Sequence, residues 1–145
     1  VNETEDYPII FPIHPRTKKN LNNKYFAIPR LILVEPMSYL EFIYLVKYAK
    51  AVITDSGGIT EETTVLNVPC LTLRNTTERP ETITVGSNEL VGIDPLKLIP
   101  HLNCIKDNAW KKSSIPPLWD GLTSERIVKI LNSIYSNNLQ TCKEL

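Results

Sequence analysis

The sequence predicts an α/β fold in which helices cover a parallel sheet in three layers. Short apolar runs alternate regularly with segments whose apolar residues have helical spacing. The helix-like segments are about ten residues long, as in the βαβ units that connect neighbouring parallel strands. The chain has 145 residues, of which 42% are hydrophobic, and this suffices for one buried core. We therefore expect a single domain over residues 1–145.

Three strands and two helices are predicted in the first part of the chain: strands 8–13, 30–36 and 51–55, and helices 15–25 and 38–50. The first strand is rich in β-branched and aromatic residues between prolines, so we expect it to be buried. In the second helix, apolar residues recur on one face, and Ser38 stands at its start as the expected N-cap.

The alternation continues through the middle of the chain with helix 58–67, strand 69–74, a loop up to residue 81, a short helix 81–85, strand 88–92 and helix 94–102. The last of these helices begins Asp-Pro, a favourable helix entry. A polar stretch with paired prolines follows and predicts a surface loop. The chain closes with an amphipathic helix over 123–139, for which Thr123 or Ser124 is the expected cap. The apolar residues on one side of that helix are Ile127, Ile130, Leu131 and Ile134.

Composition excludes several classes of function. The chain has 16 basic and 16 acidic residues, and this balance predicts neither a nucleic-acid partner nor a membrane partner. The three cysteines are far apart and odd in number, so we expect no metal site and no disulfide framework, and a reduced, cytoplasmic setting. No apolar stretch approaches the length of about 20 residues that spans a bilayer. The start shows neither a signal peptide nor an initiator methionine, so we expect a piece of a longer chain.

The segment "ITDSGGITEE", residues 53–62, carries the first functional signal. In a parallel sheet, ligands bind beyond the carboxyl ends of the strands, and this turn lies at such an end. Gly57 and Gly58 allow close approach of the backbone, the N–H groups of the helix start can hold phosphate oxygens, and the Ser56 hydroxyl adds a donor. The alternative is a simple tight turn with a Ser or Asp N-cap.

Two adjacent carboxylates follow this turn. Glu61 and Glu62 lie about one helical turn (5.4 Å) further on, where one of them faces back toward the turn. A carboxylate there suits the paired hydroxyls of a ribose better than a phosphate. The alternative is an acidic side chain that only stabilises the helix dipole. The residues alone leave open which glutamate would contact a ligand.

Two neighbouring strand ends add candidates. Arg79, in the loop after strand 69–74, is placed to contact a phosphate through its guanidinium, although a loop arginine is often only solvated. Met37 and Phe42 follow strand 30–36, where exposed backbone can bind a flat heterocycle and a phenyl ring can pack on it. Phe42 also fits a plain core position. His14, near Arg16 after the first strand, is interpreted as a packed or capping residue.

Six segments, taken in order, resemble the C-terminal half of non-hydrolysing UDP-N-acetylglucosamine 2-epimerases: "HPRT", "EPMSYLEF", "TDSGGITEE", "TLRNTTERPET", "ELVG" and "WDGLTSERIV". The resemblance runs from about residue 8 to about residue 134. The "TDSGG" turn followed by "TTERPE" at this spacing is its most specific part. The hydrolysing relatives differ in this turn, which favours the non-hydrolysing branch.

The resemblance implies two Rossmann-like domains arranged as in GT-B glycosyltransferases, with a UDP-sugar in the cleft. It implies interconversion of UDP-N-acetylglucosamine and UDP-N-acetylmannosamine, by elimination of UDP to a 2-acetamidoglucal and re-addition with inverted C2. It implies no cofactor, and it implies a homodimer for the full-length enzyme. The partner of this chain would be the N-terminal domain with the acid/base carboxylates, because nothing here matches those residues. The chain alone is therefore expected to bind UDP weakly and not to epimerise.

The resemblance also assigns roles to individual residues. It places Ser56, Gly57 and Gly58 on the diphosphate, Glu62 on the ribose hydroxyls, Arg79 on the phosphates, and the Met37 backbone with Phe42 at the uracil. The family pattern thus selects Glu62 over Glu61. Two other functions stay open, a non-catalytic UDP or UDP-sugar binding module and a glycosyltransferase donor domain. The combined "DSGG" and "TTERPE" motifs argue against the latter.

Overall fold

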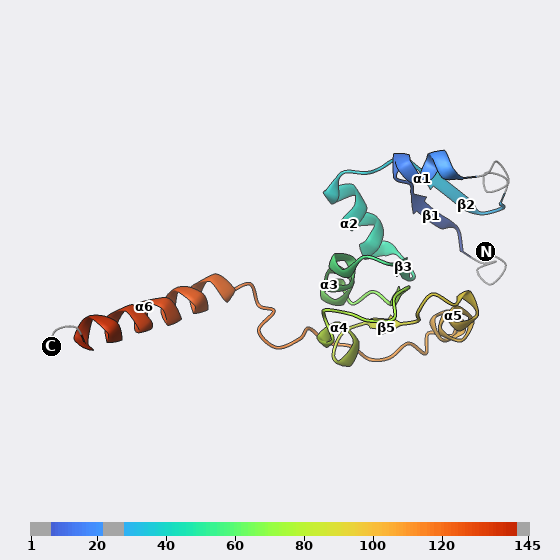
Figure 1. Cartoon of the computed structure of the whole chain (residues 1–145). Helices are drawn as coiled ribbons and strands as arrows, with labels where there is room; N and C mark the ends of the chain where they lie inside the picture. The colour runs from blue at the N-terminus through green and yellow to red at the C-terminus, as the bar shows by residue number, and fades with distance from the viewer. Residues whose placement is uncertain (1–6, 22–27, 142–145) are drawn as a thin grey trace. The chain divides into compact units, whose positions relative to one another are not determined.

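A computed structural model describes residues 7–21 and 28–141 of the chain. The chain divides into two compact units, residues 1–114 and 115–145. The first unit contains all of the described strands, and the second contains one long helix (Figure 1).

The strands of the first unit are all parallel to their neighbours, which confirms the predicted class. Strands β1 (Ile9–Pro12) and β2 (Leu31–Val34) pair with each other. Strands β3 (Val52–Thr54), β4 (Cys70–Thr72) and β5 (Asn88–Leu90) form a second sheet in that order. The described strands are therefore divided between two sheets, and each strand is shorter than the sequence suggested.

The described helices follow the predicted order. They are α1 (Pro15–Asn20), α2 (Tyr39–Tyr48), α3 (Gly57–Leu66), α4 (Glu81–Thr84), the 3-10 helix η3 (Pro95–Lys97), α5 (Leu98–Lys106) and α6 (Thr123–Thr141). The helix predicted over 94–102 is thus a 3-10 turn followed directly by α5. This break places Pro100 in the first turn of α5, where its missing N–H is tolerated. Residues 22–25 of the first predicted helix lie outside the described residues.

Local capping chemistry explains where two of these helices start. Ser38 precedes α2 as predicted, and the Glu41 carboxylate accepts hydrogen bonds from the Ser38 hydroxyl (2.7 Å) and N–H (2.9 Å). These two hydrogen bonds lower the pKa of Glu41. Asp94 precedes η3 and accepts a hydrogen bond of 3.0 Å from the Leu96 N–H.

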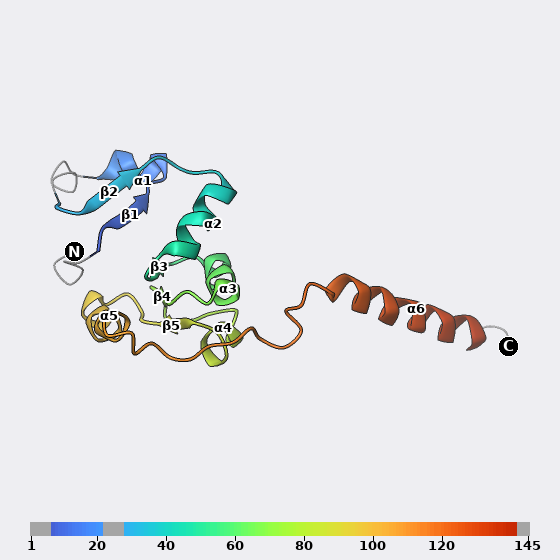
Figure 2. The same ribbon diagram turned by 180° about the vertical axis from the view of Figure 1, so that it is seen from behind.

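The β3–β4–β5 sheet is covered on both sides by helices of the first unit. Leu71, Val91 and Ile105 form a buried apolar cluster between the sheet and α5, which we call the apolar side. Figures 1 and 2 show α5 and α3 on different sides of β4 and β5. Trp110 packs against the apolar cluster and donates from Nε1 to the Ser87 carbonyl at 3.0 Å. The loop predicted over residues 106–122 is confirmed from residue 107 on, because no described helix or strand lies between α5 and α6. The prediction is wrong in placing Trp110 at the surface, because its apolar ring packs on the core.

The other side of the same sheet is lined by small polar residues. Successive residues of a strand point to opposite faces, so Cys70 and Thr72 lie opposite Leu71 and face α3. We call this face the threonine side; its fully buried members are Thr60, Thr63, Thr64, Cys70, Thr72, Thr82, Ser87 and Asn88. The α3 threonines donate within the helix, Thr64 Oγ1 to the Thr60 carbonyl at 2.8 Å and Thr63 Oγ1 to the Ile59 carbonyl at 3.0 Å. These hydrogen bonds allow the hydroxyls to be buried.

The first strand is less covered than the sequence predicted. Ile10 and Phe11 are 43% and 41% exposed, and Ile32 of the neighbouring strand is 47% exposed. A sheet of only two described strands has fewer neighbours to cover its faces. The prediction that strand 8–13 is buried holds only at its end, where Ile13 is 2% exposed.

The second unit is built around α6. The helix begins at Thr123, so neither Thr123 nor Ser124 precedes it as a cap. Asp120 contacts the start of α6. Its carboxylate accepts hydrogen bonds from the Leu122 N–H at 3.0 Å and from Arg126 Nη1 at 2.9 Å. The hydrogen bonds from Arg126 and Leu122 lower the pKa of Asp120 to about 2. In the described part of the chain, neither α6 nor any other helix has the length and apolar character that a bilayer span requires.

Candidate functional site

The candidate site lies where α3 begins, at the carboxyl end of β3. Ser56 is the N-cap residue by position, and its N–H donates to Thr54 Oγ1 at 3.0 Å. The Ser56 hydroxyl makes no capping hydrogen bond to the helix. The alternative of a simple N-cap therefore agrees with the position of Ser56 but not with the hydrogen bonding of its side chain. The turn therefore offers a half-buried hydroxyl next to the first N–H groups of a helix of 10 residues, an arrangement that suits an anion.

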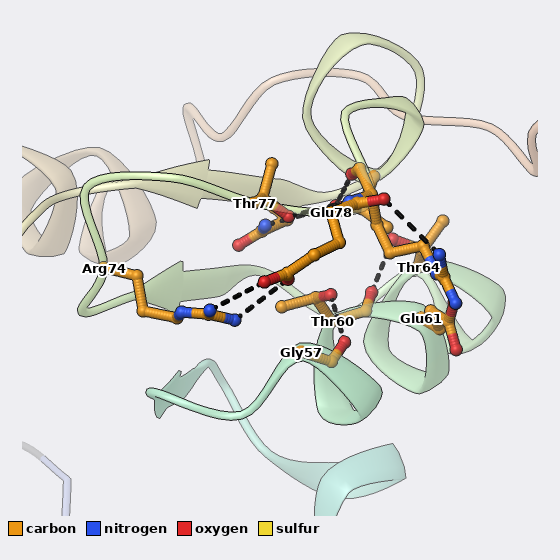
Figure 3. A network of polar contacts seen from close by, with 10 residues as sticks. Gly57, Thr60, Glu61, Thr64, Arg74, Thr77 and Glu78 are labelled. Carbon is orange, nitrogen blue, oxygen red and sulfur yellow. Dashed lines mark hydrogen bonds and ion pairs between the residues drawn. The ribbon is translucent and has the colours of Figure 1, made fainter.

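An arginine–glutamate pair from the neighbouring strand end lies beside Gly57 (Figure 3). Arg74 follows β4 and donates from Nη1 and Nη2 to the two carboxylate oxygens of Glu78, at 3.1 and 2.8 Å. A methyl group on Gly57 would be 3.6 Å from Arg74 Nη1 and 3.7 Å from Glu78 Oε2. The hydrogen bonds and charge of Arg74 lower the pKa of Glu78. Sequence reasoning missed Arg74 and Glu78, although Arg74 directly follows a strand that ends beside the "DSGG" turn.

Arg79 also lies at this edge, as the parallel order of β3 and β4 predicted. Its Nε pairs with the Glu61 carboxylate of α3, and its N–H donates to Thr77 Oγ1 at 3.0 Å. The hydrogen bond and charge of Glu61 raise the pKa of Arg79, which stays a cation. The side chain is half exposed, so its guanidinium remains accessible to a ligand. The structure brings Arg79 to Glu61 of α3 rather than to Glu62.

Glu62 faces a different neighbour. The negative charge of Glu62 raises the pKa of Tyr39 at the start of α2. The hydrogen bond that the Tyr39 hydroxyl donates to the Glu62 carboxylate acts in the same direction. The two adjacent carboxylates therefore diverge, Glu61 toward the loop after β4 and Glu62 toward α2. The residues alone left open whether Glu61 or Glu62 contacts a ligand, and their positions relative to Arg79 do not decide between them. Tyr39 is a neighbour of Glu62 that sequence reasoning missed.

The two candidates near the start of α2 are Met37, which precedes the helix, and Phe42, which lies within it. Met37 lines an open hollow of about 490 Å³ with Leu40, Glu41, Tyr44 and Leu45. Phe42 is not among the residues that line it, because it lies on another face of α2, although it is also partly buried. The hollow is thus distinct from the ends of β3 and β4 that carry the other candidates.

His14 has a structural role, as interpreted from the sequence. It is the N-cap of α1, and its Nδ1 accepts a hydrogen bond of 3.2 Å from the Arg16 N–H. Among residues 7–21 and 28–141, no three metal-ligating side chains gather. At the strand ends, backbone N–H groups, a hydroxyl and guanidinium groups can bind an anion. The carboxylates nearby can accept hydrogen bonds from the hydroxyl groups of a ligand.

A family model and several known proteins match most of the chain. A family model described as "UDP-N-acetylglucosamine 2-epimerase" matches residues 1–132. The chain is 47% identical over 136 residues to the UDP-N-acetylglucosamine 2-epimerase of Methanocaldococcus jannaschii, covering 89% of this chain and 36% of that protein. It is 36% identical over 135 residues to the Escherichia coli K12 protein of the same name, again covering 89% and 36%. The chain thus spans little more than a third of the length of these relatives.

A solved structure agrees with the sequence comparisons. The crystal structure of the M. jannaschii UDP-GlcNAc 2-epimerase, in complex with UDP-GlcNAc and UDP, matches with a TM-score of 0.73 and 46% identity. The match covers 90% of this chain and 37% of that chain. The similarity therefore extends over both units of the described chain but over a limited part of the solved protein.

Proposed function

The chain belongs to the UDP-N-acetylglucosamine 2-epimerase family, and from this premise we propose that it forms the UDP-binding domain of such an enzyme. The observation that carries the proposal is the set of groups that two neighbouring strand ends bring to α3. The Ser56 hydroxyl and the backbone at Gly57 lie where α3 begins, Arg74 lies beside Gly57, and the Arg79 guanidinium pairs with Glu61 about one turn further along the helix. Such a site fits the diphosphate of a nucleotide.

The remaining assignments follow the family pattern. Gly58 is proposed as a second backbone contact to the diphosphate, since it is exposed at the helix start. Glu62 is proposed to bind the ribose hydroxyls, which is supported by its direction toward α2, away from the carboxylate that pairs with Arg79. The Met37 backbone and Phe42 remain the proposed uracil contacts. For Met37, which precedes α2, the proposed contact is made by its main chain.

The proposed reaction is the reversible conversion of UDP-N-acetylglucosamine to UDP-N-acetylmannosamine, by elimination and re-addition of UDP. This chain would hold UDP, the leaving group, while a catalytic domain outside residues 1–145 would supply the acid and base. We further propose that the whole enzyme is a homodimer, that residues 1–145 act as one Rossmann-like domain, and that the protein is cytoplasmic.

The first test is titration of the chain with UDP, UDP-N-acetylglucosamine, uridine and ADP. We expect the uridine nucleotides to bind and ADP to bind more weakly. Glu62→Ala should lose about tenfold or more in affinity for both UDP and uridine, because both carry the ribose hydroxyls. Glu125→Ala, an exposed glutamate in the first turn of α6, is the matched control and should bind as the wild type does.

The outcomes separate the parts of the proposal. If the wild type binds neither UDP nor uridine, the proposed site is wrong. If Glu62→Ala binds as tightly as the wild type, the ribose assignment is wrong. A second measurement follows the conversion of UDP-N-acetylglucosamine by the 145-residue chain, where we expect none. Conversion by this chain would contradict the proposal that the acid and base lie elsewhere.

A further inference from the structure

A buried chain of hydrogen bonds runs from the centre of the β3–β4–β5 sheet to the backbone of Arg79. Thr72 Oγ1, on β4, donates to Asn88 Oδ1 at 2.6 Å, and Asn88 Nδ2, on β5, donates to Thr82 Oγ1 at 3.2 Å. Thr82 Oγ1 then donates to the Arg79 carbonyl at 2.8 Å. Thr72 is 1% exposed, and Thr82 and Asn88 are 0% exposed. The first two of these hydrogen bonds are therefore buried, and the last one, to the carbonyl of the exposed residue Arg79, is partly buried.

The direction of these hydrogen bonds is fixed by the groups that make them. An amide nitrogen has only protons to give, so Thr82 Oγ1 must accept from Asn88 and has its own proton left for the Arg79 carbonyl. The Thr82 N–H donates to the same carbonyl at 3.0 Å. In a buried setting each of these groups would be costly to leave without a partner, so the set holds together as a unit.

Arg79 is thus held at both of its ends. Its carbonyl is fixed by Thr82, and the following Pro80 restricts the backbone of Arg79 to extended conformations. Its guanidinium is fixed by the Glu61 carboxylate of α3. A cationic side chain in a loop is ordinarily free to sample many positions, whereas the backbone of this one is anchored through buried side chains to strands β4 and β5.

We propose that Thr82 and Asn88 are positioning residues for Arg79, which they hold where it can bind the phosphates of the nucleotide. The inference rests on the proposed function, because it takes Arg79 as a phosphate ligand. Neither Thr82 nor Asn88 contacts the ligand. Their contribution is geometric, since a small misplacement of a binding group costs much of its affinity.

The test uses the full chain of 145 residues and compares UDP with uridine, which lacks the phosphates. Thr82→Val keeps the shape of the side chain and removes the hydroxyl. We expect Thr82→Val to lose about tenfold in affinity for UDP with uridine affinity unchanged, because only the phosphate contact depends on Arg79. Thr82→Ser restores the hydroxyl and should bind UDP nearly as the wild type does.

Thr64→Val is the matched control. Thr64 is equally buried on the threonine side, but its hydroxyl donates to the Thr60 carbonyl within α3 and does not reach Arg79. Thr64→Val should therefore leave the ratio of UDP to uridine affinity unchanged, whatever it does to stability. A general loosening of the threonine side would instead change both valine variants alike.

The ratio of UDP to uridine affinity in Thr82→Val decides the proposal. An unchanged ratio overturns it, whether both affinities stay the same or both fall equally. If Thr82→Val does not fold, Thr72→Val, two hydrogen bonds further from Arg79 than Thr82, is judged by the same ratio, with a smaller loss expected. Failure of the wild type to bind either ligand would reject the proposed function itself, and the positioning role with it.

Discussion

The two sides of the β3–β4–β5 sheet are built from different chemistry. The apolar side packs Leu71, Val91 and Ile105 together, and these contacts have no preferred direction. The threonine side buries hydroxyls and an amide, each with a defined hydrogen-bond partner. No buried side-chain nitrogen or oxygen among the described residues lacks a partner. We infer that the apolar side mainly contributes free energy of folding, and that the threonine side fixes the positions of groups near the proposed site.

The largest effect is expected on the apolar side. Leu71 is 0% exposed, and Leu71→Ala should lower the free energy of unfolding by about 3 kcal/mol, because it removes buried methyl groups and leaves a cavity. Urea unfolding followed by circular dichroism measures it. Leu96, which is 72% exposed in η3, is the matched control, and Leu96→Ala should change little. Equal losses at the two leucines would contradict the assignment of the core.

A smaller effect is expected where the threonine side is most tightly packed. A methyl group on Gly86 would lie 2.5 Å from Thr64 Oγ1 and 2.6 Å from the Thr82 carbonyl oxygen. Gly86→Ala should therefore lower the free energy of unfolding by about 2 kcal/mol, because backbone and buried side chains must shift to admit the methyl group.

Gly58 provides the comparison for that experiment. It lies in α3 with nothing within 4 Å of the added methyl group, so Gly58→Ala should stabilise the chain by up to about 1 kcal/mol. Thermal unfolding of both variants checks the pair. Equal tolerance of alanine at both positions would show that the threonine side is loosely packed, and it would weaken the case for precise positioning.

The smallest effect is confined to alkaline pH. Burial raises the pKa of the Cys70 thiol above its ordinary value, with hydrogen bonds between Cys70 and the side chains of Thr63 and Thr72 acting in the opposite direction. A raised pKa in the folded state means that the thiol stabilises the fold below its unfolded pKa. This contribution falls as the pH rises from the unfolded pKa through the folded one.

Cys70→Ser removes this titration and keeps a small polar side chain. Its free energy of unfolding should therefore fall less steeply above pH 9 than that of the wild type. Denaturant unfolding at a series of pH values from neutral to alkaline measures the two slopes. Parallel curves would indicate that the Cys70 thiol is not desolvated, and that the threonine side admits water.

Local features of the sequence predicted a large part of this architecture. The apolar runs placed all five described strands, and Ser38 and Asp94 marked helix starts because their side chains act on N–H groups only a few residues away. Contacts within the candidate site were predicted only where sheet order implied them, as for Arg79 beside α3. Trp110 was missed because its polar neighbours in sequence are not its neighbours in space.

The sequence by itself thus determined the parallel α/β class and the glycine turn at Ser56, Gly57 and Gly58, because both are encoded by residues adjacent in the chain. Only the tertiary structure decided that Arg74 and Glu78 lie beside Gly57, and that Glu61 and Glu62 face different partners. It also decided that buried hydroxyls reach the carbonyl of Arg79. The physical reason is that these contacts depend on strand order and side-chain direction, which bring together residues from separate βα units.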